Sequence, residues 1–414
     1  MAAEPHRTPA EPSTAPGGRL ASSTRSTLLG AMFLMATSAI GPGFITQTTT
    51  FTVQLGAAFA FAIVISILID IALQLNVWRV IGVSGRRAQE LGNLVAPGLG
   101  WVMAAFLLIG GLVFNIGNVS GAGLGTDAML GLDPKIGGAL SALIAIGIFL
   151  SKRAGVAVDR IVVVLGLVMI VLTTYVAITS GPPVGQALRN VVLPEDIDVL
   201  AITTLVGGTI GGYIVYAGAH RLLDSGVSGP GRVRDITRGS VTGILITAVM
   251  RVVLFLAILG VVTGGAALDP TNQAASAFEQ AAGEVGLRVF GIVLWAAAIT
   301  SVIGASYTTV SFVTTRATSD RTRTWLVVGF IAFTSLVYVL IGTAPTTLLV
   351  FAGAFNGLLL PIGIAVLLWV ATRRTDLLNG YRYPRWLLAI GWVAWLLTLY
   401  LAVRSIQPVI DLFS

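Results

Sequence analysis

The feature that most constrains this chain is the repeated occurrence of apolar segments long enough to cross a bilayer. A transmembrane helix needs ~20 mostly apolar residues, and a scan of the 414 residues at that length predicts eleven such segments. Their centres lie near Met35, Ile67, Leu108, Ile144, Val168, Ile210, Leu254, Ala298, Phe333, Leu360 and Trp395. Only 10% of the residues are charged, against ~25% in soluble domains, which excludes an ordinary soluble enzyme. We therefore expect an all-α integral membrane protein.

Basic residues are distributed unevenly among the segments that connect these helices. If the N-terminus is cytoplasmic, the cytoplasmic connections and the N-terminal tail together contain twenty of the 25 Lys and Arg residues. Cytoplasmic loops carry such an excess, so we expect a multi-pass protein of the cell membrane with its N-terminus inside and its C-terminus outside. The net charge of +7 then reflects topology. The chain's partner is accordingly the lipid bilayer and not nucleic acid.

Two of the apolar segments contain sequences that interrupt a helix. The first has Gly41-Pro42-Gly43 at mid-membrane depth, where proline removes a backbone donor and glycine disfavours helix. The sixth has Gly207-Gly208 and Gly211-Gly212 near its centre. Such glycines can also serve close helix packing. Two interruptions five helices apart, however, are typical of a secondary transporter with an inverted repeat of five plus five helices.

This organisation predicts three parts of the chain. Residues 1–26, rich in Pro, Ala, Ser and Thr, are expected to form a disordered cytoplasmic tail. Residues 27–372 are expected to form the ten-helix core, with repeats over about 27–180 and about 200–372. Residues 373–414 are expected to form a cytoplasmic loop and the eleventh helix. Because unpaired backbone at the midplane is tolerated only where it lines a cavity, the substrate site is predicted at the two interruptions.

The residues around these interruptions resemble the Nramp family of proton-coupled divalent-metal transporters. Leu29-Gly30 precedes Gly41-Pro42-Gly43-Phe44 at the spacing at which the family has Leu-Gly and Asp-Pro-Gly-Asn. The segments 73–91 and 371–386 also match the family pattern, and the similarity covers nearly the whole chain from Thr27 onward. The resemblance implies a leucine-transporter-like fold in which helices 1 and 6 are broken.

The residues that bind metal in the Nramp family differ in this chain. The family uses the Asp and Asn of its first break, where this chain has Gly41 and Phe44, and a Met of helix 6, where this chain has only Gly and Tyr. Divalent cations of this kind prefer carboxylate, thioether or imidazole ligands. Acidic residues of the family's third helix correspond to Asn115 and Asn118, which cannot carry a proton. The resemblance thus implies an atypical branch without the metal motif, and we expect no metal or other cofactor.

Without these carboxylates, the broken helices favour an anion. The N-terminal end of a helix carries roughly half a positive charge and free amide donors. The candidate substrate-binding residues are those at the interruptions and the polar or aromatic side chains near them: Gly41, Pro42, Gly43, Phe44, Gln47, Thr48, Gly208, Gly211, Gly212, Tyr213, Asn115 and Asn356. The structural alternatives are that threonines bond to their own helix, that amides connect helices and that tyrosine packs.

Two ionisable residues, Asp70 and Arg251, lie inside predicted spans. Charges at that depth are costly and usually functional, so we assign both to ion coupling and treat Asp70 as the proton carrier. A purely structural ion pair is the alternative. His220, near the cytoplasmic end of the sixth span, can titrate near neutral pH or form a gate contact.

Together these residues predict a monomeric secondary transporter for a small organic anion, a carboxylate such as 5-oxoproline, coupled to H⁺ or Na⁺. The suggestion of 5-oxoproline comes from resemblance, because Nramp-like proteins with Gly-Pro-Gly-Phe resemble a branch associated with its breakdown. The first alternative is transport of Mn²⁺, Fe²⁺ or hydrated Mg²⁺ through backbone carbonyls and water, and the second is a non-transporting sensor or scaffold. An enzyme is not expected, because the sequence has no cysteine and no recognisable catalytic or phosphate-binding motif.

Overall fold

Helices form the regular structure throughout the described chain. The computed structural model describes residues 40–224, 226–314, 318–341 and 343–413. In order, its α-helices are α2 (Pro42–Leu55), α3 (Phe59–Ser84), α4 (Ala88–Val95), α5 (Leu99–Leu130), α6 (Pro134–Leu150), α7 (Lys152–Thr179), α8 (Val184–Val192), α9 (Val199–Ile210), α10 (Ile214–Asp224), α11 (Val233–Thr263), α12 (Gln273–Val313), α13 (Asp320–Leu340), α14 (Pro345–Arg373) and α15 (Arg385–Asp411). The predicted tail 1–26 and the first half of the first apolar segment lie outside the described residues.

The long helices are apolar enough to cross a membrane. Eight stretches of the described chain meet the length and hydropathy of a span, or nine when the pair Val164–Thr179 and Val184–Val192, bent by 102°, is included. This count is lower than the eleven expected spans for two reasons. The stretch Pro42–Ser84 is taken as one although it has 43 residues, and α6 has only 17 residues. The fold is therefore an all-helical membrane bundle, as the apolar segments predict.

Polar residues and glycines fix where several of these helices begin and bend. The Asp133 side chain accepts hydrogen bonds from the amides of Lys135 and Ile136 at the start of α6, and Asp198 accepts one from Ala201 at the start of α9. Both carboxylates pair amides that have no acceptor within the helix. Within α12, Gly283 has a φ of 66° and divides the helix at a kink.

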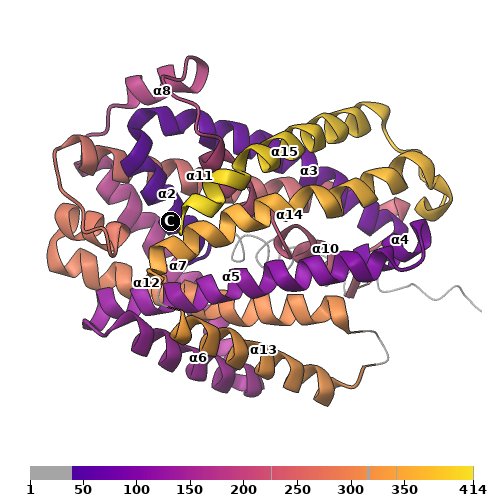
Figure 1. Ribbon diagram of the computed structural model, residues 1–414, viewed down its shortest axis with the longest axis horizontal. Helices are drawn as coiled ribbons and strands as arrows, with labels where there is room; N and C mark the ends of the chain where they lie inside the picture. Colours follow the sequence, from indigo (N-terminus) through magenta and orange to yellow (C-terminus); the bar gives the residue numbers. More distant parts are fainter. Residues whose placement is uncertain (1–39, 225, 315–317, 342, 414) are drawn as a thin grey trace, which may run out of the picture.

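The helices run side by side, and the connections between them gather at two ends of the bundle (Figure 1). Figure 1 shows α8 and the C-terminus at one end and α4 at the other. The connection containing α8 and the connection containing α4 thus lie at opposite ends of the bundle.

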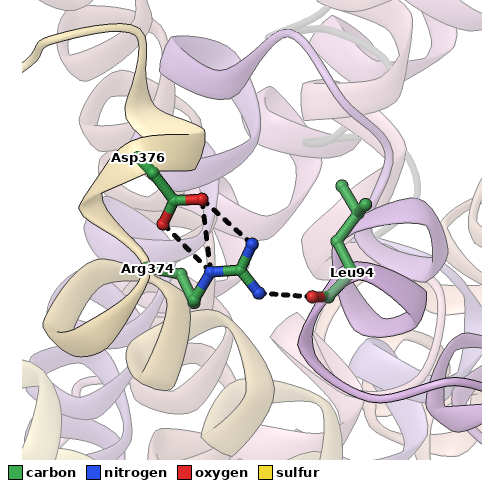
Figure 2. A network of polar contacts seen from close by, with 3 residues as sticks. All are labelled: Leu94, Arg374 and Asp376. Carbon is green, nitrogen blue, oxygen red and sulfur yellow. Dashed lines mark hydrogen bonds and ion pairs between the residues drawn. The ribbon is translucent and has the colours of Figure 1, made fainter.

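At the end that holds α4, one arginine joins two distant parts of the chain. Arg374 follows α14 and donates to the carboxylate of Asp376 through Nε and Nη2, each at 2.9 Å. Its Nη1 donates to the carbonyl of Leu94 in α4, as Figure 2 shows. The hydrogen bond to Arg374 lowers the pKa of Asp376 below its ordinary value. This exposed contact connects the segment after α14 to the short helix after α3.

Candidate functional site

The first interruption is a helix start buried inside the bundle. Gly41 is extended, Pro42 is the first residue of α2, and neither is exposed. Proline suits this position because the first turn lacks acceptors for its own amides. The amides of Gly43 and Phe44 belong to this first turn and so point out of the helix end. Among the described residues, which begin at 40, α2 therefore starts inside the bundle at the position where the first break is predicted.

The second interruption divides the sixth apolar segment between α9 and α10. Gly211 is extended after the last residue of α9, and Gly212 has a φ of +53°, in the left-handed region that favours glycine. A Cβ at Gly212 would also collide with Oδ1 of Asn356. The prediction was wrong for Gly208, which lies within α9 and is helical. Its lack of a side chain instead gives room to Gln47, so here the packing alternative is correct.

Buried polar atoms without hydrogen-bond partners gather around these two breaks. A Cβ at Gly41 would lie 2.9 Å from Oγ of Ser301 and 3.8 Å from Oδ1 of Asn118. Tyr213 Oη faces Asn118 from the second break. Oγ of Ser301, Oη of Tyr213 and both side-chain polar atoms of Asn118 have no hydrogen-bond partner, so Tyr213 and Asn118 face each other without a well-formed hydrogen bond. More than nine in ten buried polar groups are normally paired, so this orphan cluster, Asn118, Tyr213 and Ser301, is where a ligand is expected.

The buried guanidinium of Arg251 lies against the first turn of α2. Its Cζ is 4.5 Å from the ring centroid of Phe44, and its Nη1 donates to Oγ1 of Thr209 at 2.9 Å. Nε and Nη2 of Arg251 have no partner, although only 1% of the residue is exposed. The first turn of α2 is thus bordered by Asn118 and Ser301 near Gly41 and by a cation near Phe44.

Asp70 joins Arg251 from α3. The two side chains attract each other electrostatically, and Thr209 lies beside both. Asp70 is 1% exposed, and neither of its carboxylate oxygens has a hydrogen-bond partner. The two ionisable residues predicted inside spans therefore lie in one neighbourhood next to the α2 break, and both retain unused hydrogen-bonding capacity.

Gln47 and Thr48, both buried one turn further along α2, differ in their capacity to bind a ligand. Nε2 of Gln47 donates to the carbonyl of Leu349 in α14 at 2.9 Å, while its Oε1 is unpaired. The hydroxyl of Thr48 donates to the carbonyl of Phe44, four residues earlier, at 2.7 Å. The structural alternative thus describes Thr48, whereas Gln47 keeps one free acceptor.

The remaining candidates occupy different places. Nδ2 of Asn356 donates to the carbonyls of Gly110 and Ala352, and its unpaired Oδ1 touches the second break. Nδ2 of Asn115 donates to the hydroxyls of Ser306 and Thr334, which connects α5 to α12 and α13. Asn115 is therefore not brought to the breaks.

His220 lies apart from the breaks, in α10. Its Nε2 accepts from the amide of Ala88 at the start of α4, at 3.4 Å. The imidazole also lies 5.0 Å from the Phe312 ring, between centroids. His220 therefore contributes to the packing of α10 against α4 and α12.

Three residues near the breaks were not predicted as site residues from the sequence: Ser301, Thr209 and Asn118. Ser301 and Thr209 are common residues in apolar helices; Thr209 lies between the two glycine pairs of the sixth segment, whereas nothing in the neighbours of Ser301 marks it. Asn118 stands out in the sequence only through the family resemblance. A search for polar residues one to two turns from a predicted break would have included Thr209 but not Ser301, which comes from a helix distant in the sequence.

Helices broken at mid-bundle around buried, incompletely paired polar groups define a class of membrane transport proteins. Residues 32–407 match the family described as natural resistance-associated macrophage protein-like. The chain therefore belongs to the Nramp family and is a membrane transport protein, not an enzyme. This confirms the resemblance found in the sequence.

Relatives and solved structures agree with this assignment. The membrane protein YcsG of Bacillus subtilis, described as uncharacterized, is 53% identical over 367 residues, covering 88% of this chain and 90% of its own. An uncharacterized membrane protein of Haemophilus influenzae is 50% identical over 390 residues, with coverages of 94% and 98%. A variant of the manganese transporter of Eremococcus coleocola superposes with a TM-score of 0.73 at 18% identity, with coverages of 97% and 90%. The structure of MhsT in complex with L-phenylalanine superposes with a TM-score of 0.65 at 17% identity, covering 93% of this chain and 98% of its own. At these identities the structures establish the leucine-transporter fold alone.

Proposed function

We propose that this protein is a secondary transporter for a small organic anion, a carboxylate such as 5-oxoproline, coupled to H⁺ or Na⁺. The observation that carries the proposal is the buried Arg251, whose Nε and Nη2 have no acceptor. Asp70 lies close enough to attract Arg251 electrostatically, yet a buried donor without an acceptor still costs about 1–3 kcal/mol, and more on a charged group. A carboxylate satisfies a guanidinium with two parallel hydrogen bonds. An anionic substrate is therefore the simplest partner for these donors.

The orphan cluster complements the rest of such a substrate. A lactam presents an N–H and a carbonyl on the same edge, and the carboxamide of Asn118 offers one unpaired acceptor and one unpaired donor. Asn118 borders Gly41, and Arg251 borders Phe44. Gly41 immediately precedes α2 and Phe44 lies in its first turn, three residues later, so both groups border the same helix start. A small ring that carries a carboxylate at one side and a lactam at the other would contact both of them.

The neighbourhood of Asp70 and Arg251 supplies a route to coupling. A substrate carboxylate that pairs with Arg251 adds a negative charge beside Asp70, and a nearby like charge favours the protonated carboxyl. Substrate binding and proton uptake then promote each other, because coupling between two sites is reciprocal. Proton symport follows from this arrangement, and Na⁺ in contact with the Asp70 carboxylate is the alternative coupling ion.

The proposed architecture has eleven spans in an inverted five-plus-five repeat, with the N-terminus cytoplasmic. A straight helix of 43 residues would extend ~65 Å, twice the ~30 Å of the hydrocarbon core, which supports α2 and α3 as separate spans. Residues 27–39 with α2 would form the first span, and α9 with α10 the sixth. The remaining spans are α3, α5, α6, α7 and α11 to α15. This arrangement is proposed for a monomer.

The alternative substrate is a divalent cation, as in the manganese transporter from Eremococcus coleocola. One observation favours it: both carboxylate oxygens of Asp70 and Oε1 of Gln47 in α2 are buried acceptors without a hydrogen-bond partner. The adjacent Arg251 opposes it, because a fixed cation repels a dication. Among the described residues, no group of three or more His, Cys, Asp and Glu side chains could hold a metal ion. The absence of the family's Asp-Pro-Gly-Asn residues supports the same preference for an anion.

Uptake into proteoliposomes tests the proposal. We expect labelled 5-oxoproline or a related small carboxylate to accumulate when an inward H⁺ or Na⁺ gradient is imposed, and Mn²⁺ not to accumulate. Asp70→Asn should keep binding of the carboxylate, measured by thermal shift, while losing gradient-driven accumulation. Accumulation of Mn²⁺ with no response to any carboxylate would refute the anion proposal and favour the alternative.

A further inference from the structure

A groove lined by three arginines lies away from the substrate site, where the end of α3 meets the start of α11. It has a volume of about 790 Å³ and is lined by Arg79, Arg234, Thr237, Arg238, Val241 and Thr242, among others. The adjoining turn hydrogen-bonds to the last part of α3, through the Gly229 amide and the Gly82 carbonyl at 2.8 Å. The groove is therefore at the arginine-rich end of the bundle, which the charge distribution predicts to be cytoplasmic.

Arg79 is held at the back of the groove with unused capacity. Its Nη2 donates to Oγ1 of Thr237 at 2.7 Å, and its Nη1 contacts Oη of Tyr381 at 3.5 Å. Only 8% of Arg79 is exposed, and its Nε has no hydrogen-bond partner. Because both hydrogen-bond partners are neutral hydroxyls, they do not neutralise the charge of Arg79, which can still attract an anionic ligand.

Arg234 and Arg238 lie four residues apart on α11, one turn from each other on the same face of the helix. They are exposed, and like charges at this spacing repel each other in the absence of an anion. The nearest acidic residue on this helix, Asp235, instead forms an ion pair with Arg232 at 3.4 Å. The groove thus presents three guanidinium groups and no competing carboxylate in its lining.

The same face of α11 continues as an apolar stripe. Arg238 and Thr242 are followed at helical spacing by Leu245, Val249 and Val252, of which Leu245 is 48% and Val249 62% exposed. Residues three or four apart share one helix face, so the stripe leads from the groove into the predicted hydrocarbon region. The acyl chains of a lipid would lie along this stripe while its headgroup fills the groove.

We propose that this groove binds the phosphate group of an anionic phospholipid. Guanidinium groups bind phosphate oxygens through paired hydrogen bonds, and basic pockets at the cytoplasmic side of membrane proteins bind lipid headgroups. The same chemistry would accept free inorganic phosphate, but a free ion would leave the adjoining stripe without a role. This inference does not depend on the substrate proposed above.

Lipid retention by the full chain, measured by native mass spectrometry in detergent, tests the proposal. The probes are phosphatidylglycerol, phosphatidylcholine and inorganic phosphate. The variant is R234Q/R238Q, and the matched control is R86A/R321A, which removes two exposed arginines at the same end but outside the groove. Each arginine near an anionic headgroup contributes about fivefold in affinity, so we expect the groove variant to bind phosphatidylglycerol roughly 25-fold more weakly and the control to match the wild type.

The remaining outcomes distinguish the source of the phosphate and the role of the groove. Displacement of phosphatidylglycerol by low-millimolar inorganic phosphate, lost in the groove variant, would support the site but reassign it to the free ion. Equal binding of phosphatidylglycerol and phosphatidylcholine, or an equal loss in both variants, would overturn the proposal. If the double variant does not fold, R238Q alone, expected to lose about fivefold, provides the same comparison.

Discussion

Two asparagines three residues apart on α5 show how differently the same side chain is used in this bundle. Asn115 donates to Thr334 at 2.8 Å and to Ser306 at 3.2 Å, and so connects three helices. Asn118 has neither of its polar atoms paired and lies between the two breaks. Both are fully buried. The two side chains differ in their surroundings. Asn115 lies beside the hydroxyls of Ser306 and Thr334, which accept its hydrogen bonds, whereas Asn118 lies near Gly41 at the start of α2.

The same contrast separates polar groups across the molecule. Thr48, Thr49 and Thr52 all return their hydroxyls to carbonyls of α2 itself. Oγ of Ser301 and Nε and Nη2 of Arg251 remain unpaired beside the breaks. Unpaired buried polar groups destabilise a fold. The packing of the surrounding bundle must therefore offset the free-energy cost of the unpaired groups at the breaks. Substitutions should therefore have opposite effects on stability and binding in the two regions.

The largest effect is expected for Arg251→Gln. Removal of a buried charge that pairs with a ligand weakens binding by roughly 30-fold or more, since such pairs are worth about 2–5 kcal/mol. Binding of the carboxylate is measured by thermal shift on purified protein. The double variant Asp70→Asn/Arg251→Gln removes both charges and controls for the burial of an uncompensated Asp70. Wild-type affinity in either variant would mean that the free donors of Arg251 have no ligand.

Asn118→Ala and Asn115→Ala are expected to give opposite results. Asn118→Ala should reduce ligand affinity about tenfold, because it removes up to two hydrogen bonds of ~1 kcal/mol each, while the unfolding temperature stays equal or rises. Asn115→Ala should destabilise the protein by about 1–2 kcal/mol and leave affinity unchanged. Unfolding temperature and affinity are measured on the same preparations. If both variants lose stability without losing affinity, the orphan cluster is not a binding site.

The sequence predicted the fold well because bilayer thickness and backbone hydrogen bonding leave few choices. Apolar length predicted eleven spans, of which the described chain has eight or nine. Gly211-Gly212 marked the end of α9, and Gly41-Pro42-Gly43 marked the start of α2, since neither sequence continues a helix easily. Gly208 was wrongly included because a glycine needed for packing against Gln47 looks the same in the sequence as one needed for a turn. Asn115 was chosen as a candidate instead of Asn118 because the sequence does not show which of the two has partners. The partners of Asn115, Ser306 and Thr334, lie nearly 200 residues or more away in the sequence. Ser301 could not be found for the same reason.

The second break provides a sharper test of what a glycine does. Gly212→Ala places a side chain at a φ of +53° and against Oδ1 of Asn356. Left-handed strain alone costs about 1–2 kcal/mol, and the collision adds to it. The matched control is Gly304→Ala in α12, where nothing lies within 4 Å of the added Cβ and where alanine should stabilise by about 0.5–1 kcal/mol. The two unfolding temperatures should therefore shift in opposite directions, and a common direction would contradict the strained turn at Gly212.

The smallest effect is expected at the exposed ion pair in Figure 2, which contrasts with the buried charges at the breaks. Arg374 donates to Asp376 and so lowers the pKa of that carboxyl below its ordinary value. A lowered pKa contributes stability above the ordinary value of about 3.9 and loses it as the pH falls through the lowered pKa. Asp376→Asn should therefore unfold at a slightly lower temperature than the wild type at pH 7, with the difference shrinking toward pH 3. Because water and salt screen an exposed pair, the shift at pH 7 should also be smaller than that caused by Asn115→Ala. A difference that grows toward acid pH would mean that the protonated form of Asp376 is the stabilised one, which would contradict a stabilising ion pair between Asp376 and Arg374.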